Sequence, residues 1–339
     1  MNREERIAGC LLGTAVGDAL GLPYEGLPPR RAARMLGPPD RFRFFWGRGM
    51  VSDDTEHAWM TAQAFTAARG DVDGFRRDLA RRLRWWLLGI PAGVGLATLR
   101  AIGRLWLGWA PEHSGVFSAG NGPLMRAAIL GVLIEDDAQL AEFICASTRL
   151  THSDPKAERA AFTIALATRM SCDSSAVDGG EFLDRLRAMH DDAEWLELVQ
   201  RALAAADGGR SVEEFAVELG LARGVTGYAY HTGPIVLHAW RRYSRDYRAG
   251  VTAVIRCGGD TDTTAAILGG VLGAANGRGA IPAEWSQRLW TWPADERVLA
   301  DLCAERPVVL RVSALLLRNA LFACVVLVHG VRRLLPPWS

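Results

Sequence analysis

Apolar residues recur along most of this chain at the three- and four-residue spacing of amphipathic helices. Strand-like alternation bounded by turn pairs is nearly absent, and no repeat or low-complexity linker divides the sequence. The spacing predicts helices over residues 7–20, 56–68, 72–88, 98–107, 123–134, 137–149, 155–170, 180–190, 194–205, 212–219, 234–243, 247–256 and 263–275. We therefore expect an all-α fold that forms a single compact multi-helix domain.

Two of these predicted helices carry stripes of small residues. The first has glycines at a spacing of four, and the helix after the second acidic cluster has a similar row; the residues are Gly9, Gly13, Gly17 and Gly21, and Gly269, Gly270, Gly273 and Gly277. Glycine lowers helix propensity, but it lets another helix approach closely. We expect these two helices to lie at the centre of the domain.

The C-terminal segment, residues 308–335, is strongly apolar. Its polar residues Arg311, Arg318, His329 and Arg333 fall on one narrow face of a helix, and they leave no run of about 18 uncharged residues. The pattern favours a buried helix with a polar stripe over attachment to a membrane surface. We expect residues 1–305 to form the domain and residues 306–339 to pack on it.

Composition and charge exclude several classes of protein. Hydrophobic content of 49% and charged content of 23% are ordinary for a soluble protein, and a net charge of +1 gives no nucleic-acid footprint. Lys156 is the only lysine, which argues against a phosphate-binding P-loop and against Schiff-base chemistry. The six cysteines form no CxxC pair, and the N-terminus lacks a signal peptide, so we expect a cytoplasmic location.

Two acidic clusters, residues 52–55 and 260–263, are the strongest candidates for chemistry. Each stands where a loop meets a predicted helix. Taken alone, the first is more often a helix cap than a site. The second is harder to explain as a cap, because capping needs one acceptor and this segment offers Asp260, Asp262 and Thr263 together. Carboxylates in apolar surroundings repel one another unless cations neutralise them, and oxygen ligands indicate Mg²⁺ or Mn²⁺ rather than Zn²⁺.

Three further features contain polar residues in apolar or glycine-rich surroundings. Asp18 lies in the glycine-striped helix, and Glu25 follows it in a loop that can face a site. Residues 118–123 precede an apolar helix, where free backbone N–H groups suit a phosphate, although such a segment alone is more often a plain turn. His152 lies at another loop-to-helix junction and could contact a ligand.

The ordered motifs GxxxGDALGxPYE, SDDTE, SAGNGPLMR, THSDP and GGDTDTTAAILGG resemble those of the ADP-ribosylglycohydrolase family across residues 6–276. The resemblance implies an all-α fold with two Mg²⁺ or Mn²⁺ ions in a central cleft. It also implies hydrolysis of the glycosidic bond between ADP-ribose and an acceptor, most often a protein side chain, with arginine as one candidate. The implied partners are an ADP-ribosylated protein and a cognate ADP-ribosyltransferase system.

The resemblance also assigns roles to individual positions. It implies metal ligation by Ser52, Asp53, Asp54, Asp260, Asp262 and Thr263, catalysis by Glu25 and Asp54, and substrate binding by Gly93, Gly95, Ser118, Gly120, Asn121, Gly122 and His152.

One departure from the family pattern leaves the acceptor open. Arginine-specific bacterial relatives carry an aspartate that faces the guanidinium, and this chain has Ala92 and Gly93 there. Two alternatives to the hydrolase also remain: a non-catalytic ADP-ribose-binding or immunity protein, and a dinuclear phosphohydrolase that acts on small ADP-ribose-like molecules. A degenerate binder should lose metal ligands, and all six are present.

Overall fold

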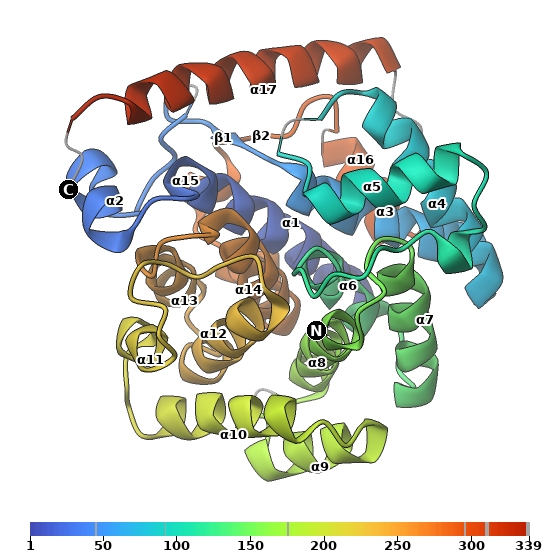
Figure 1. Ribbon diagram of the computed structural model, residues 1–339, viewed down its shortest axis with the longest axis horizontal. Coiled ribbons are helices and arrows are strands. Elements are labelled where there is room, and N and C mark those ends of the chain that lie inside the picture. Colours follow the sequence, from blue (N-terminus) through green and yellow to red (C-terminus); the bar gives the residue numbers. More distant parts are fainter. Residues whose placement is uncertain (45, 92, 175, 295, 309–311, 337–339) are drawn as a thin grey trace.

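The two glycine-striped helices, α1 (Arg3–Gly21) and α14 (Thr261–Asn276), lie side by side at the centre of the molecule, as predicted (Figure 1). They run antiparallel with their backbones in contact. A Cβ atom added at Gly13 would lie 2.2 Å from the carbonyl oxygen of Gly269, and one at Gly17 would lie 2.1 Å from that of Ala265. No larger residue fits along this line without moving a helix.

The computed structural model describes every residue except 45, 92, 175, 295, 309–311 and 337–339. Within the described residues, helices dominate, and the single strand pair is parallel and two residues long. The α-helices between α1 and α14 are α2 (Pro29–Leu36), α3 (Asp53–Ala68), α4 (Val72–Leu88), α5 (Leu96–Trp106), α6 (Ala128–Leu133), α7 (Asp137–Arg149), α8 (Pro155–Asp173), α9 (Gly179–Met189), α10 (Ala193–Asp207), α11 (Val212–Glu218), α12 (Ala229–Arg242) and α13 (Tyr247–Arg256). After α14 come α15 (Ala283–Ser286), α16 (Glu296–Cys303) and α17 (Val312–Arg333), and the strands are β1 (Gly49–Met50) and β2 (Leu289–Trp290). Short 3₁₀ turns are η1 (Leu22–Tyr24), η2 (Pro111–His113), η3 (Leu124–Arg126) and η4 (Arg278–Ala280).

The expected all-α fold is confirmed, and the differences concern short elements and helix starts. The segment predicted as one helix over residues 123–134 divides into η3 and α6. Helix α12 begins at Ala229 rather than at Pro234, which lies inside it. Helix α2 escaped prediction because it is short and rich in arginine, with only Ala32 and Leu36 buried.

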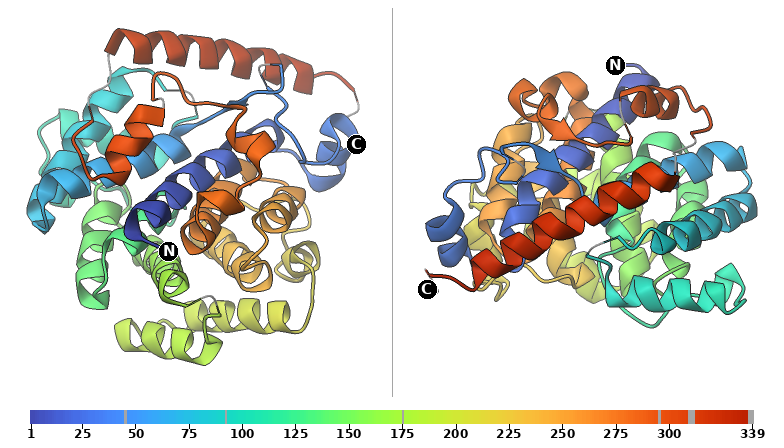
Figure 2. Two further views of the ribbon diagram at one scale, coloured as in Figure 1. Left: turned by 180° about the vertical axis from the view of Figure 1, so that it is seen from behind. Right: turned by 90° about the horizontal axis from the view of Figure 1, so that it is seen from above.

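The central pair is surrounded by helices that bury their apolar faces on it. α3, α6, α8, α12 and α13 contact α1 or α14, whereas α9 and α10 form the lower end of the molecule in Figure 1. α17 crosses the opposite end as a long strap, which is clearest from above (Figure 2). This arrangement puts the loops that precede α3 and α14 at the same end of the central pair, facing a shared cavity.

Helix α17 contradicts the expected buried helix with a polar stripe. Its buried side chains are Asn319, Phe322, Arg318 and His329, the last two at 4% and 8% exposure, whereas Leu327 and Val328 are 69% and 71% exposed. The polar residues face inward because the body offers them partners: Arg318 Nη1 lies 2.8 Å from Glu56 Oε1, and His329 Nε2 lies 2.8 Å from the Pro23 carbonyl oxygen. Arg311 lies outside the described residues.

Among the residues that the structure describes, two segments are long and apolar enough to cross a membrane, judged by length and composition alone. The first contains α1 and is 94% buried, as the core helix of a soluble protein would be. The second is α17, of which only 17% is buried.

Candidate active site

One cavity of about 600 Å³ brings together every site residue that the sequence selected. This volume lies within the range of small-molecule sites, about 300–1,000 Å³. Its lining includes Glu25, Ser52, Asp53, Asp54, Gly93, Gly95, Ser118, Gly120, Asn121, Gly122, His152, Asp260, Asp262 and Thr263. Residues from the start and the end of the chain therefore share one site, although the role of each remains a prediction.

Asp18 of α1 holds the first acidic loop in place. Its Oδ2 atom accepts hydrogen bonds from the backbone N–H of Ser52 at 2.8 Å and from the Thr55 hydroxyl at 2.5 Å. Ser52 is the N-cap of α3, and its hydroxyl accepts from the Asp54 N–H at 3.3 Å. The predicted helix cap is confirmed, and the same residue lines the cavity, where its role as a ligand stays a prediction.

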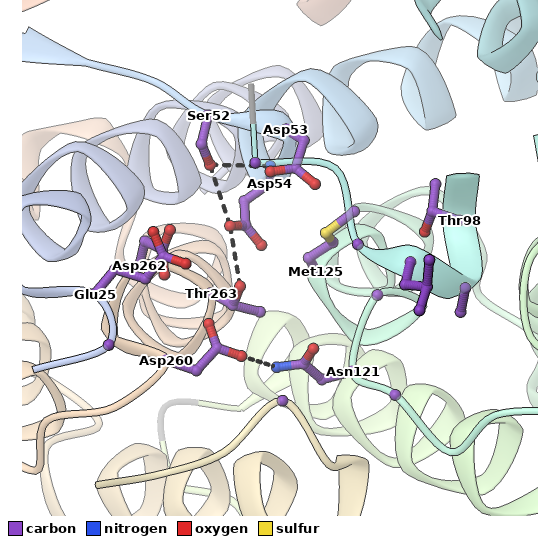
Figure 3. A pocket seen from close by; sticks show the side chains of 18 of the residues that line it. Glu25, Ser52, Asp53, Asp54, Thr98, Asn121, Met125, Asp260, Asp262 and Thr263 are labelled. Carbon is purple, nitrogen blue, oxygen red and sulfur yellow. Dashed lines mark hydrogen bonds between the residues drawn. The ribbon is translucent and has the colours of Figure 1, made fainter. Parts of the chain in front are cut away.

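Asp54 joins the two acidic clusters (Figure 3). Its Oδ2 atom accepts hydrogen bonds from the hydroxyls of Ser52 at 3.2 Å and of Thr263 at 3.1 Å, so the starts of α3 and α14 meet at this carboxylate. Its Oδ1 atom is buried without a hydrogen-bond partner, as is Oδ1 of Asp262. Buried oxygens without partners are costly in a folded protein, which makes this pair a place where a further group could bind.

Asp260 occupies the N-cap position of α14 but does not cap the helix with its side chain. Its Oδ2 atom instead accepts a hydrogen bond from Asn121 Nδ2 at 2.7 Å. The preceding glycines, Gly258 and Gly259, have φ of 69° and 79°, which turns the chain into this position. Gly259 also bonds to the loop after Glu25 through Leu27, which brings that glutamate to the same cavity.

The carboxyl groups of the cavity are electrostatically strained. Burial, followed by repulsion from neighbouring carboxylates, raises the pKa values of Asp53, Asp54 and Asp262 well above the usual range. Burial and the charge of Asp260 also raise the pKa of Glu25, although solvent reaches its side chain. These groups can all be ionised near neutral pH only if positive charge is supplied nearby.

The donor set fits a hard divalent cation. The side chains of both clusters present carboxylate and hydroxyl oxygens, with the Oδ1 atoms of Asp54 and Asp262 left over. Within the described part of the chain, however, no three histidine, cysteine, aspartate or glutamate side chains are grouped as a ready-made metal site. Hydrogen bonds draw Asp54 towards Thr263 and Asp260 towards Asn121, so ligation requires these carboxylates to turn.

The glycine-rich loop before η3 packs directly on His152. A Cβ atom added at Gly120 would lie 2.9 Å from His152 Nε2, and one at Gly122 would lie 3.0 Å from its Cε1 atom. Burial lowers the pKa of His152 to about 3, so its ring is neutral at pH 7. The sequence argument for a phosphate site required free backbone N–H groups in this loop. In the structure, however, the N–H of Gly120 donates to Ser118 Oγ and the N–H of Asn121 donates to the Gly227 carbonyl, so these two groups are not free.

Arg126, at the end of the same motif, supports this loop from beneath. Its guanidinium is fully buried and donates to the Gly122 carbonyl at 3.2 Å and to the Thr151 hydroxyl at 2.8 Å. Thr151 Oγ1 in turn lies 2.9 Å from His152 Nδ1. One signal in the sequence points to this role: Arg126 is a lone arginine inside an apolar segment.

The loop before α5 closes another side of the cavity. Gly93 has φ of 85°, and a Cβ atom there would lie 3.6 Å from Asp53 Oδ1. Ala92, at the position that bears on acceptor choice, lies outside the described residues. Sequence reasoning missed several lining residues, among them Thr226 and Gly227 from the turn before α12, and Phe322 and Val326 from α17.

The sequence model of the ADP-ribosylglycohydrolase family matches residues 1–311. The chain belongs to this family. The match of the family model ends at residue 311, one residue before α17 begins. The domain boundary predicted after residue 305 remains a prediction. The family assignment identifies the chain as an ADP-ribosyl hydrolase.

Individual relatives of this ADP-ribosylglycohydrolase cover nearly its whole length. An uncharacterized protein of Archaeoglobus fulgidus is 30% identical over 84% of this chain and 92% of its own. The ADP-ribosyl-[dinitrogen reductase] glycohydrolase of Rhodospirillum rubrum is 28% identical over 92% of this chain and 96% of its own. A solved structure described as an ADP-ribosylglycohydrolase-related protein complex is 29% identical, with a TM-score of 0.63, and covers 90% of this chain and 99% of its own.

The buried carboxyls predict that the protein loses stability as pH rises when no divalent ions are present. Burial raises the pKa of Asp18 from 3.8 to about 6 in the folded protein. Its stabilising contribution is therefore full below the unfolded pKa of 3.8 and is lost as pH rises through about 6. We expect the free energy of unfolding to fall by roughly 2–3 kcal/mol from Asp18 alone, as measured by denaturation in chelator.

The Asp18→Asn variant provides the control for this pH dependence. The amide keeps one oxygen for Ser52 and Thr55 and places a neutral group at the unpartnered Oδ1 position. Its stability should fall less steeply between about pH 4 and pH 7. A chelated wild-type protein that gained stability over this range would contradict the prediction.

Proposed function

We propose that this chain is a Mg²⁺- or Mn²⁺-dependent hydrolase that cleaves the glycosidic bond between ADP-ribose and an acceptor on a protein. One observation carries the proposal: the two acidic clusters meet at Asp54 in a cavity that also contains the glycine loop and His152. Acidic oxygens suit a ribose held by cations, and the adjoining loop provides a surface for the rest of the nucleotide. The family assignment supports the same chemistry.

Different residues of the cavity would bind the metal ions, orient the carboxylates and accept a proton. When bound, two divalent ions would compensate the carboxylates of Asp53, Asp54, Asp260 and Asp262 and polarise the oxygens around the anomeric carbon. Asn121 orients Asp260 through its amide. Glu25 has its pKa raised towards neutrality at the solvent-exposed side of the cavity, which suits a general base that takes a proton from the attacking water.

A protein substrate and a cognate ADP-ribosyltransferase are part of this proposal, and so is a cytoplasmic location. The name of the Rhodospirillum rubrum relative describes an ADP-ribosylated protein as its substrate. All six cysteines are free thiols, which agrees with a reducing compartment. The alternative of a non-catalytic binder would be favoured by lost ligands, and all six oxygen-bearing positions are retained.

The acceptor can be determined by a direct comparison. We expect the protein with Mg²⁺ to release free ADP-ribose from one of three model substrates, which carry ADP-ribose on arginine, on serine or on nucleic acid. Chelation should lower the rate at least about 10²-fold, and added Mg²⁺ or Mn²⁺ should restore it. Release at the full rate in chelator would refute metal dependence, and no release from any substrate would favour the binder.

A further inference from the structure

The outer face of α17 is apolar from Leu316 to Val331, with the exposed Ser313 one turn before it. Its exposed apolar residues follow one another at three- and four-residue spacing, and they are Leu316, Leu317, Ala320, Leu321, Cys324, Leu327, Val328 and Val331, continued by Leu334 and Leu335 just after the helix. At 3.6 residues per turn this row covers an arc of about 140°. No charged residue lies within that arc, which is wider than the narrow seam of a coiled coil.

The inward side of α17 combines buried polar groups with Phe322, which packs against Leu22, Phe44 and Met50. Arg318 forms its ion pair with Glu56, and Asn319 Nδ2 donates to the Gly89 carbonyl at 2.7 Å. Turning the leucines inward would remove these buried polar groups from their partners, which is costly. The apolar row therefore stays in solvent unless another surface covers it, and an exposed row of this length marks an interaction site.

The surroundings of the row are basic. Helix α2 lies beside the C-terminal end of α17, because Arg31 donates to the carbonyl of Arg333 and Arg332 donates to that of Met35. Arg30 and Arg34 on α2 are exposed, and neither helix contains an aspartate or glutamate. One end of the apolar row is thus bordered by a group of arginines.

An exposed tryptophan follows, two residues later, a phenylalanine that contacts this end of α17. Trp46 is 95% exposed and has φ of 55°, a conformation that is unusual for a bulky residue. Two residues earlier, the Phe44 ring contacts the His329 ring edge-to-face at 4.8 Å, which places this loop against α17. Tryptophan is enriched at the boundary between lipid and water, where one part of the ring is wet and the other apolar.

We propose that the outer face of α17 docks the protein on an anionic phospholipid bilayer, with α17 lying in the plane of the surface. Leucine and valine side chains would enter the acyl boundary, while Arg30, Arg34 and Arg332 would contact lipid phosphates. The sequence argument that favoured a buried helix over attachment to a membrane surface depended on the burial of this segment, and only 17% of α17 is buried. Since Phe322 and Val326 of the same helix line the cavity, docking would hold the site beside the membrane.

Charge favours a bilayer over a second copy of the chain. A parallel pair of α17 helices would set the arginines of the two copies against one another. An antiparallel pair would place them beside Val312 and Leu316, at an end of the helix that has no carboxylate. An anionic bilayer satisfies both features, because its acyl region can bury the apolar row and its headgroups can bind the arginines.

The test is sedimentation of the full-length protein with vesicles. We expect it to bind vesicles that contain phosphatidylglycerol and to bind pure phosphatidylcholine vesicles at least about tenfold more weakly. Added salt should weaken binding, because it screens the arginines. The Arg30→Ser, Arg34→Ser variant should lose about fivefold in partitioning for each arginine. Equal binding to both vesicle types, or none, would overturn the proposal.

A pair of acidic variants tests the apolar row itself. Leu327→Glu, Val328→Glu should lose vesicle binding by at least about tenfold while keeping its melting temperature and its hydrolysis of a soluble substrate, because both side chains are exposed. Val217→Glu is the matched control, an exposed valine on α11, and should bind like wild type. A wild-type dimer in light scattering that this double variant converts to monomer would show that a second copy covers the row, and it would overturn the proposal.

Discussion

Replacing Asp54 with asparagine should lower the rate of ADP-ribosyl hydrolysis by about 10³-fold while raising the melting temperature of the chelated protein. Activity falls because Asp54 is the carboxylate at which both acidic clusters meet, through Ser52 and Thr263. Stability rises because burial and neighbouring carboxylates raise its pKa well above the usual range, so a neutral amide removes that electrostatic penalty. Release of ADP-ribose and thermal unfolding measure the two effects.

Opposite changes in rate and stability distinguish a functional carboxylate from a structural one. Asp184→Asn, on an exposed position of α9, is the control and should change neither quantity. If Asp54→Asn kept the wild-type rate, Asp54 would not take part in catalysis. If it lowered the melting temperature in chelator, the account of strained carboxylates would be wrong.

The second large effect concerns the contact between α1 and α14. Gly13→Ala should lower the free energy of unfolding by about 3 kcal/mol or more, because its Cβ atom would lie 2.2 Å from the Gly269 carbonyl oxygen. Tyr247 also holds α1 at this point, because its hydroxyl donates a hydrogen bond to the Gly13 carbonyl at 2.6 Å. Neither helix can retreat without breaking other contacts. Chemical denaturation measures the loss.

Gly103→Ala is the matched control, since it makes the same chemical change in another helix. Gly103 lies inside α5, and a Cβ atom there would meet nothing within 4 Å. Alanine should therefore stabilise the protein by about 0.5–1 kcal/mol through its better helix propensity. Similar effects of the two substitutions would show that backbone contact does not determine the role of Gly13.

Much of this fold could be predicted because its signals are local. Helical spacing identified most of the helices, and the four-residue glycine spacing indicated the central pair. The candidate carboxylates stood out because residues such as Asp262 occur in apolar sequence, where a buried charge is costly unless a partner compensates it. Their convergence at one cavity could be inferred only by treating two distant clusters as halves of one site.

What escaped prediction depends on contacts between distant segments. The polar stripe of α17 was visible in sequence, but not that Glu56 and the Pro23 carbonyl would draw it inward and leave the leucines outside. The N–H groups of Gly120 and Asn121 looked available until the structure showed their acceptors. Helix α2 is too short and too polar for its periodicity to identify it.

The antiparallel contact of α1 with α14 also has a consequence for biosynthesis. Helix α1 leaves the ribosome well before α14, and its glycine face has no partner until residue 276 has been translated. Until then the Ser52–Asp54 loop lacks Thr263, and no fragment can assemble the site. The nascent chain must therefore keep an apolar, glycine-rich helix from aggregating while the segments between α1 and α14 are synthesised, and we expect chaperones that bind such segments to assist it.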